Sequence, residues 1–281
     1  MAGPNFIVIG AKKSGTTSLY RYLDLHPEIA MAYPRELNFF VPGGARSANH
    51  AAPSDQSPEW YLSRFDAPAP VHGESSPNYA SFPLITGVPK RIRALVPDVS
   101  LIYLVRDPIE RMLSEYGQRW GHNGVRRPVS EVFSDPELVD TTYVVRGRYQ
   151  MQIEQFLEHF EENRLLIVAQ EDLRNNRQAT LDRIFAFVGV KSFSTPKFDK
   201  EHNIARDRRR SARLAGVSRR WGEHNPVRTL FRTGKVKDLL SRPMPRHELE
   251  PEVRARVAEY FHEDARRLRA FTGQRFESWS V

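Results

Sequence analysis

Two apolar segments of this 281-residue chain are each followed directly by a turn and a helical pattern. The first, Asn5–Ile9, leads through a glycine-bounded turn into Thr16–His26, where apolar and aromatic residues recur at helical spacing until Pro27. The second, Val99–Val105, leads into a helix that we expect to begin near Ile109. Short apolar runs of this kind are typical of strands that are buried on both faces of a parallel sheet.

The alternation of strands and helices continues through the second half of the chain. A helical pattern over about Met151–His159 precedes a third apolar run, Leu165–Ala169, and another helix is predicted over about Gln178–Val188. The segment Glu250–Phe271 predicts a terminal helix. We therefore predict one domain, residues 1–281, with an α/β fold in which helices flank a central parallel sheet.

Two stretches lack this regular pattern. Gly43–Asp55 is rich in Gly, Ala, Ser and Pro and predicts a surface loop. Asp199–Pro245 is basic and irregular, and we expect a short helix there together with a lid over the functional site. Much of the net charge of +8 lies in this second stretch, at Arg206–Arg220. Such a balance favours an anionic partner: a nucleic acid, a membrane surface, an acidic glycan or an anionic cofactor.

The composition excludes some kinds of site and location. The chain has no cysteine, which excludes disulfides and thiolate metal sites. No run approaches the roughly 18 consecutive apolar residues of a membrane span. The N-terminus lacks the basic and apolar regions of a secretory signal. We therefore expect a cytoplasmic protein without stable membrane insertion.

The turn after the first strand, Gly10-Ala-Lys-Lys-Ser-Gly-Thr-Thr-Ser18, is suited to bind an anion. Backbone N–H groups of a tight turn that leads into a helix form an anion nest, and Lys13 could add a full charge. The hydroxyl groups that could donate to the same anion are those of Ser14, Thr16, Thr17 and Ser18. The common nucleotide-binding loop has a lysine after its second glycine, and here none follows Gly15. Taken alone, this loop is equally consistent with a helix start whose lysines lie in solvent.

A second group of polar residues follows the second strand. Arg106 lies at the carboxyl end of that strand, where ligands bind in open α/β sheets. Asp107 and Pro108 are residues typical of a helix start, and Ser114 lies two turns into the helix. Together the arginine and the serine could grip a phosphate. Taken alone, an ion pair of Arg106 with Asp107 or Glu110 remains an alternative.

Together the two segments resemble those of the sulfotransferases that use 3′-phosphoadenosine 5′-phosphosulfate. Lys13–Leu19 is similar to the family loop K-x-G-T-[TS]-x-L, which binds the 5′-phosphosulfate. Arg106–Tyr116 is similar to R-[DN]-P-x-x-R-x-x-S-x-[YF], which binds the 3′-phosphate through its first Arg and its Ser. The resemblance covers about residues 5–280. It implies the P-loop-like fold of the sulfotransferases.

The resemblance extends to the branch of this family that modifies glycans and that includes related bacterial-type enzymes. Pro34–Phe40 is similar to that branch's E-x-x-F-F segment, whose glutamate is the catalytic base, and this gives that role to Glu36. Gly73–Tyr79 looks like its E-K-[ST]-P-x-Y segment, but Ser75 stands where the branch often has lysine. That departure counts against a heparan-like polyanionic acceptor.

The resemblance implies an O-sulfotransferase that needs no metal ion. Glu36 would accept the proton of an acceptor hydroxyl, on a carbohydrate, lipid, natural product or carrier-bound alcohol. Lys13 would stabilise the charge on the departing nucleotide. Thr16, Thr17 and Ser18, with the amides of the loop around Ser14 and Gly15, would hold the 5′-phosphate. Arg106 and Ser114 would hold the 3′-phosphate and so reject ATP, and Arg209 and Arg210 would close over the cofactor.

Three further residues are candidates for the acceptor site, each with a structural alternative. Arg35 could contact an anionic acceptor or pair with a neighbouring acid. Glu74 could be a second carboxylate in the acceptor pocket or part of a structural ion pair. Tyr79 could line that pocket or pack in the core.

Two other functions compete with sulfuryl transfer. The first is a P-loop kinase or other nucleotide hydrolase, against which stands the missing lysine after Gly15. The second is a protein that binds nucleic acid or heparin through Arg206–Arg220, although the aromatic patterns of RNA-binding modules are absent from the sequence. We therefore predict no nucleic-acid partner.

Overall fold

The computed structural model describes residues 3–43, 56–123, 127–134, 141–199, 209–210, 242–243 and 247–281. Its centre is a sheet of five parallel strands in the order β2-β3-β1-β4-β5. The strands are β1 (Phe6–Gly10), β2 (Ile29–Met31), β3 (Val71–Ser75), β4 (Ser100–Val105) and β5 (Leu165–Ala169). The prediction of an α/β fold with a central parallel sheet is confirmed. β1, β4 and β5 match the three predicted strands, whereas β2 and β3 were not predicted.

Helical segments connect these strands, as parallel pairing requires. The segment from β1 to β2 contains α1 (Thr16–Leu23), and the segment from β2 to β3 contains α2 (Pro58–Leu62). α3 (Val88–Leu95) lies between β3 and β4. α4 (Pro108–Asn123) and α7 (Tyr149–Leu157) lie between β4 and β5.

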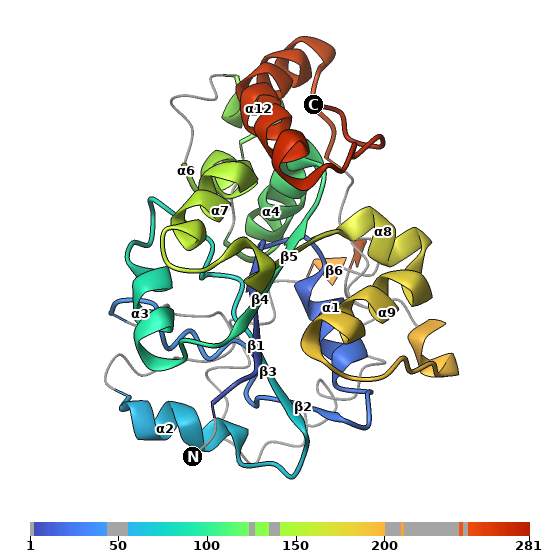
Figure 1. Cartoon of the computed structure of the whole chain (residues 1–281). Helices are drawn as coiled ribbons and strands as arrows, with labels where there is room; N and C mark the ends of the chain where they lie inside the picture. The colour runs from blue at the N-terminus through green and yellow to red at the C-terminus, as the bar shows by residue number, and fades with distance from the viewer. Residues whose placement is uncertain are drawn as a thin grey trace, which may run out of the picture.

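The helices cover both faces of the sheet (Figure 1). On one face, Phe6 and Val8 of β1 share an apolar cluster with residues of α1 and α9 (Arg177–Val188). On the other face, Ile7 and Ile9 belong to a cluster that includes residues of α2, α3 and α7. The alternating direction of side chains along β1 therefore supplies both cores.

Beyond the carboxyl end of β4, α4 lies beside the last helix, α12 (Pro251–Thr272) (Figure 1). A third apolar cluster joins them, and it includes Ile109 and Met112 of α4 and Val257 and Phe261 of α12. This cluster fixes α4 over the end of the sheet where the two predicted phosphate-binding segments meet.

Most predicted helices are found, with small shifts of their ends. The helix predicted to reach His26 ends at Leu23, and a turn follows it. The predicted terminal helix is α12, displaced by one residue at each end. The remaining short elements are α5 (Val129–Val132), α6 (Thr141–Val144), α8 (Gln170–Asn175), the 3₁₀ turns η1 (Ser63–Phe65), η2 (Val145–Gly147), η3 (Glu162–Arg164) and η4 (Pro196–Asp199), and the paired strands β6 (Arg209–Arg210) and β7 (Arg242–Pro243).

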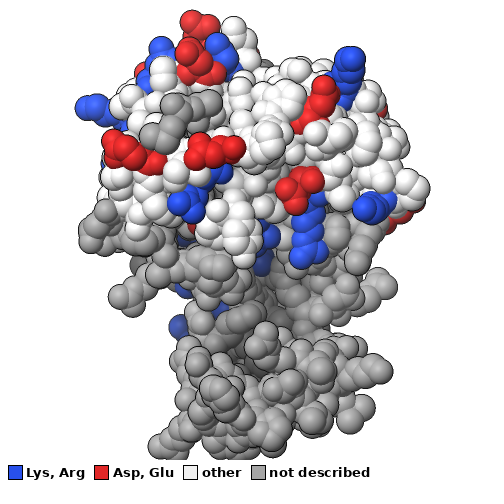
Figure 2. Space-filling model, turned by 90° about the horizontal axis from the view of Figure 1, so that it is seen from below, with Lys and Arg blue, Asp and Glu red and all other residues white. Residues whose placement is uncertain are grey.

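Two predicted segments lie largely outside the described residues. They are the loop at Gly43–Asp55 and the basic lid at about 199–245, of which the backbones of β6 and β7 are described. Among the described residues, no helix is both long and apolar enough to cross a membrane. On the face seen from below in Figure 2, basic and acidic side chains of the described residues lie among one another.

Close packing between β1 and β3 leads to a prediction about stability. A Cβ atom at Gly73 would lie 2.2 Å from Cζ of Phe6 and 2.7 Å from Sδ of Met31, and Phe6 is fully buried. We predict that Gly73→Ala lowers the free energy of unfolding by about 1–3 kcal/mol, measured by urea denaturation, because the core there must shift. Phe6→Leu in the same chain should recover part of that loss. Unchanged stability of Gly73→Ala would contradict this packing.

Candidate active site

The loop after β1 has the sharp backbone turns that the predicted anion nest requires. Lys13 and Gly15 adopt left-handed backbone conformations, with φ of 73° and 92°, which turn the chain sharply before α1. The N–H of Ala11 donates to the carbonyl of Leu104 in β4 at 2.7 Å, and this bond fixes the loop to the neighbouring strand. Because the first N–H groups of a helix have no partner within it, the start of α1 is ready to receive an anion.

The predicted hydroxyl donors of this loop differ in their exposure. The side chains of Thr17 and Ser18 are partly exposed, whereas Thr16 is buried. Ser14 is fully buried, and its hydroxyl has no hydrogen-bond partner among the described residues. This full burial does not fit the predicted contact of the Ser14 side chain with the cofactor.

Arg106 and α4 bring a second set of polar groups to the same loop. Nη1 of Arg106 donates to the carbonyl of Lys13 at 3.4 Å, and Nη2 lies 3.6 Å from a carboxylate oxygen of Glu110. The ion pair that was the alternative reading of Arg106 therefore forms, and it forms beside the loop. Ser114 of α4 is partly exposed.

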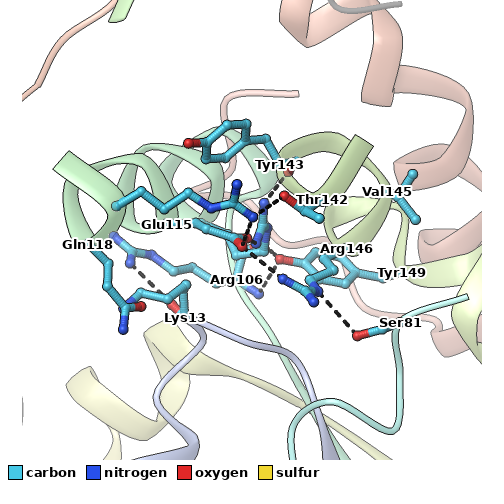
Figure 3. Close-up of polar contacts among 12 residues, drawn as sticks. Lys13, Ser81, Arg106, Glu115, Gln118, Thr142, Tyr143, Val145, Arg146 and Tyr149 are labelled. Carbon is cyan, nitrogen blue, oxygen red and sulfur yellow. Dashed lines mark hydrogen bonds and ion pairs between the residues drawn. The ribbon is translucent and has the colours of Figure 1, made fainter. Parts of the chain in front are cut away.

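Lys13 also contacts α4 directly. Its Nζ donates to Oε1 of Gln118 at 2.9 Å, and Figure 3 shows the two side chains pointing toward each other. Gln118 follows Ser114 by four residues, so both lie on one face of α4. The sequence reasoning missed Gln118, although this spacing could have indicated it.

Glu36 lies in a constrained loop after β2. Glu36 and Asn38 have left-handed backbones, with φ of 66° and 51°. The N–H of Glu36 donates to the carbonyl of Ser75 at 3.1 Å, and the amide of Asn38 donates to the carbonyl of Glu36 at 3.0 Å. The carboxylate of Glu36 lies 3.3 Å from Nη2 of Arg35, so Arg35 pairs with its neighbouring acid. Strained conformations of this kind cluster at functional sites.

Glu74 and Tyr79 support this loop from the interior. Each is 1% exposed, and the Glu74 carboxylate accepts hydroxyl bonds from Tyr61 at 2.5 Å, Ser76 at 2.6 Å and Tyr79 at 2.6 Å. Ser76 in turn accepts the N–H of Asn38 at 2.9 Å. The predicted place of Glu74 and Tyr79 in the acceptor pocket does not agree with this burial. The structural alternative holds for both, with hydroxyl donors instead of an ion pair around Glu74.

A buried ionic network joins α4 to the neighbouring loops (Figure 3). Glu115 accepts from Arg111 at 2.6 Å and from Arg146 at 2.8 Å, and Arg119 lies 3.6 Å away. Burial raises the pKa of Glu115, but the three arginines outweigh it and the net effect is a lowered pKa. Arg146 also donates to Ser81, in the loop that follows β3, at 3.2 Å.

This network makes the neighbourhood of the loop electropositive. Three guanidinium groups surround one carboxylate, so the cluster carries excess positive charge. Burial, followed by the charge of Arg146, lowers the pKa of Lys12, while Glu36 acts in the opposite direction. Lys12, Glu36 and the network are therefore close enough to influence one another. Excess positive charge at the mouth of a site favours an anionic ligand.

The remaining predictions for the site concern metal ions and the basic segment. Within the described ranges, no group of three or more His, Asp or Glu side chains is placed to hold a metal ion. The side chains of Arg209 and Arg210 lie outside the described residues, and the backbone of β6 to which they belong contacts α4.

Comparisons with known proteins agree with this arrangement. A family model described as a sulfotransferase domain matches residues 3–269. The chain is 28% identical over 221 residues to the bifunctional heparan sulfate N-deacetylase/N-sulfotransferase 4 of Mus musculus, covering 73% of this chain and 24% of that protein. It is 31% identical over 207 residues to the human heparan sulfate glucosamine 3-O-sulfotransferase 3B1, covering 69% of this chain and 48% of that protein. The chain thus spans a quarter to a half of the length of these relatives.

Solved structures show the same fold. A sulfotransferase from Alicyclobacillus acidocaldarius superposes with a TM-score of 0.72 at 21% identity, and the match covers 100% of both chains. Mouse sulfotransferase SULT7A1, solved as a complex with PAP, superposes with a TM-score of 0.53 at 16% identity, covering 94% of this chain and 84% of that one.

The buried carboxylate under the Glu36 loop gives a pH-dependent prediction. Burial raises the pKa of Glu74 despite its three hydroxyl donors, so the folded protein holds this proton more tightly than the unfolded chain. The stability that Glu74 contributes must therefore fall as the pH rises above the ordinary value of 4.5. We predict that the free energy of unfolding of the wild type, minus that of Glu74→Gln, decreases with rising pH in urea titrations.

Glu59 provides a control for that titration, because its pKa is shifted in the opposite direction. It is exposed, and a hydrogen bond from Ser57 lowers its pKa, so the difference between the wild type and Glu59→Gln should rise with pH. A difference for Glu74→Gln that is constant or also rises would contradict the raised pKa.

Proposed function

The chain belongs to the sulfotransferase family, and we propose that it transfers a sulfuryl group from 3′-phosphoadenosine 5′-phosphosulfate to an acceptor hydroxyl. One observation carries the proposal: the two phosphate-binding segments follow neighbouring parallel strands and touch, through the bond from Arg106 to the carbonyl of Lys13. Two anion grips side by side suit a nucleotide with phosphates at both its 3′ and 5′ ends. This cofactor would supply the activated sulfuryl group and a nucleotide leaving group.

On the cofactor side, the chain provides charge and oriented donors. The N–H groups at the start of α1, with the partly exposed hydroxyls of Thr17 and Ser18, would hold the 5′-phosphate. Arg106 and Ser114 would hold the 3′-phosphate and so distinguish this cofactor from ATP. Lys13 would place its ammonium group near the oxygen on which charge develops as the nucleotide leaves. Its bond to Gln118 keeps that group between the loop and α4.

On the acceptor side, Glu36 would act as the general base. Its side chain is 18% exposed, so the carboxylate remains accessible while the backbone is held by Ser75 and Asn38. The paired guanidinium of Arg35 orients the carboxylate. Proton removal and charge stabilisation by positioned groups are the main demands of such an in-line transfer, and Glu36 and Lys13 would supply them.

We propose a hydroxyl acceptor over an amine. The named relatives include an N-sulfotransferase and a 3-O-sulfotransferase, so they alone leave the choice open. Ser75, whose hydroxyl is buried, stands where a lysine would serve a polyanionic acceptor, so it bears on the charge of the acceptor, and the choice of a hydroxyl rests on the resemblance alone. In a transfer assay with labelled sulfate, hydroxyl acceptors should gain label when their matched amines do not. Preferential labelling of the amines would reverse this assignment.

The two anion grips predict nucleotide selectivity. Adenosine 3′,5′-bisphosphate should raise the melting temperature more than ATP with Mg²⁺ at the same concentration, because stabilisation follows affinity for the folded state. The reverse order would favour the P-loop kinase reading. Nucleic-acid affinity with a steep salt dependence, and no response to the bisphosphate, would favour the basic binding protein.

The assignment of the base predicts a selective loss of turnover. Glu36→Gln should lower kcat by about 10²- to 10⁴-fold, because the acceptor proton loses its receiver. The affinity for adenosine 3′,5′-bisphosphate should stay within about twofold, since Glu36 lies outside both phosphate grips. Glu59→Gln, at an exposed position in α2, is the matched control and should retain full turnover. Wild-type turnover of Glu36→Gln would exclude this residue as the base.

A further inference from the structure

The segment that follows α12 folds back onto the start of α4. We infer that three residues of this segment, Phe276, Trp279 and Ser280, position the 3′-phosphate grip: they set the place and charge environment of Arg106 without touching the nucleotide. This inference rests on the proposed function. It goes beyond it because neither phosphate-binding motif includes residues after Tyr116.

The first connection runs through Asp107, the neighbour of Arg106. Asp107 is 4% exposed, and both of its carboxylate oxygens are bonded. One oxygen accepts the N–H of Glu110 at 3.0 Å and caps α4. The other accepts the N–H of Ser280 at 2.6 Å and its hydroxyl at 2.7 Å. A buried carboxylate needs such donors, and here Ser280 supplies two of them.

The second connection is a set of polar contacts that links Ser280 to Arg106 through Arg254 and Glu110. Arg254 of α12 donates to the hydroxyl of Ser280 at 3.1 Å and lies 3.7 Å from one carboxylate oxygen of Glu110. The other oxygen of Glu110 lies 3.6 Å from Nη2 of Arg106. Exposed pairs of this kind are weak singly. As a set, they divide the charge of Glu110 between two arginines, which leaves more of the charge of Arg106 available to a phosphate.

The third connection runs through the core. Trp279 stacks on Phe276 at 4.3 Å between ring centroids, and its ring lies 5.7 Å from that of Tyr149. The hydroxyl of Tyr149 donates to the carbonyl of Arg106 at 2.7 Å. The segment therefore holds the backbone of Arg106 in place through Tyr149. It holds the charged groups around the Arg106 side chain in place through Asp107 and Glu110.

The loss of the Ser280 hydroxyl has a specific electrostatic consequence. With one donor fewer, the Asp107 carboxylate is freer to turn toward the guanidinium of Arg106, the adjacent residue. A carboxylate paired there competes with the incoming 3′-phosphate. The 5′-phosphate is held at the start of α1 and should not sense this change.

Ser280→Ala tests the inference, with Ser278→Ala as the matched control. Both serines are exposed and lie two residues apart, but it is Ser280 that bonds to Asp107. Calorimetric titration would measure affinity for adenosine 3′,5′-bisphosphate and for adenosine 5′-phosphate, which lacks the 3′-phosphate. We expect Ser280→Ala to lose about three- to tenfold in affinity for the bisphosphate and nothing for the monophosphate. Ser278→Ala should match the wild type with both ligands.

The pattern of the two affinities separates the possible failures. Equal losses for both nucleotides, or equal behaviour of the two serine variants, would overturn the role of the segment while leaving the proposed function in place. A wild-type protein without preference for the bisphosphate would overturn both.

A second pair of variants tests the same role by another route. Arg254→Met breaks the chain of contacts at a different point, and it should show the same selective loss of bisphosphate affinity. In an Arg106→Ala background, the effect of Ser280→Ala on bisphosphate affinity should vanish, because the residue through which it acts is absent. Additive losses in that double variant would overturn the inference.

Discussion

The parallel pairing of β1 with β4 is the constraint on which the site depends. Parallel neighbours end at the same edge of a sheet, so the turn after β1 and Arg106 after β4 must meet there. The bond from Ala11 to Leu104 and the bond from Arg106 to Lys13 are direct results of that pairing. The remaining features, from the α4 network to the folded-back end of the chain, act by fixing one of these two segments.

Charge is handled differently on the two sides of this edge. On one side, several arginines surround the single carboxylate of Glu115, and the excess positive charge favours an anion. On the other side, Glu36 has a partly exposed carboxylate, and its loop is held from the interior by Glu74 and the hydroxyl groups that donate to it. This difference suits the proposed roles, in which one side would bind a phosphate and the other would accept a proton.

The sequence allowed prediction of the parts that are encoded locally. β1, β4, α1 and α4 follow from apolar runs and helix-start residues, and both phosphate motifs lie within a few residues of these elements. β2 was missed because three residues carry little pattern. β3 was missed because His72, Glu74 and Ser75 read as polar, although Tyr61, Ser76 and Tyr79 satisfy Glu74 in the interior. Contacts between distant residues, such as Ser280 with Asp107, have no local signal at all.

The most direct test of the site is a crystal structure of the protein with adenosine 3′,5′-bisphosphate. We predict the 3′-phosphate within hydrogen-bonding distance of Arg106 and Ser114, and the 5′-phosphate against Lys13 and the first N–H groups of α1. A nucleotide bound with its 3′-phosphate away from Arg106, or at another edge of the sheet, would contradict it.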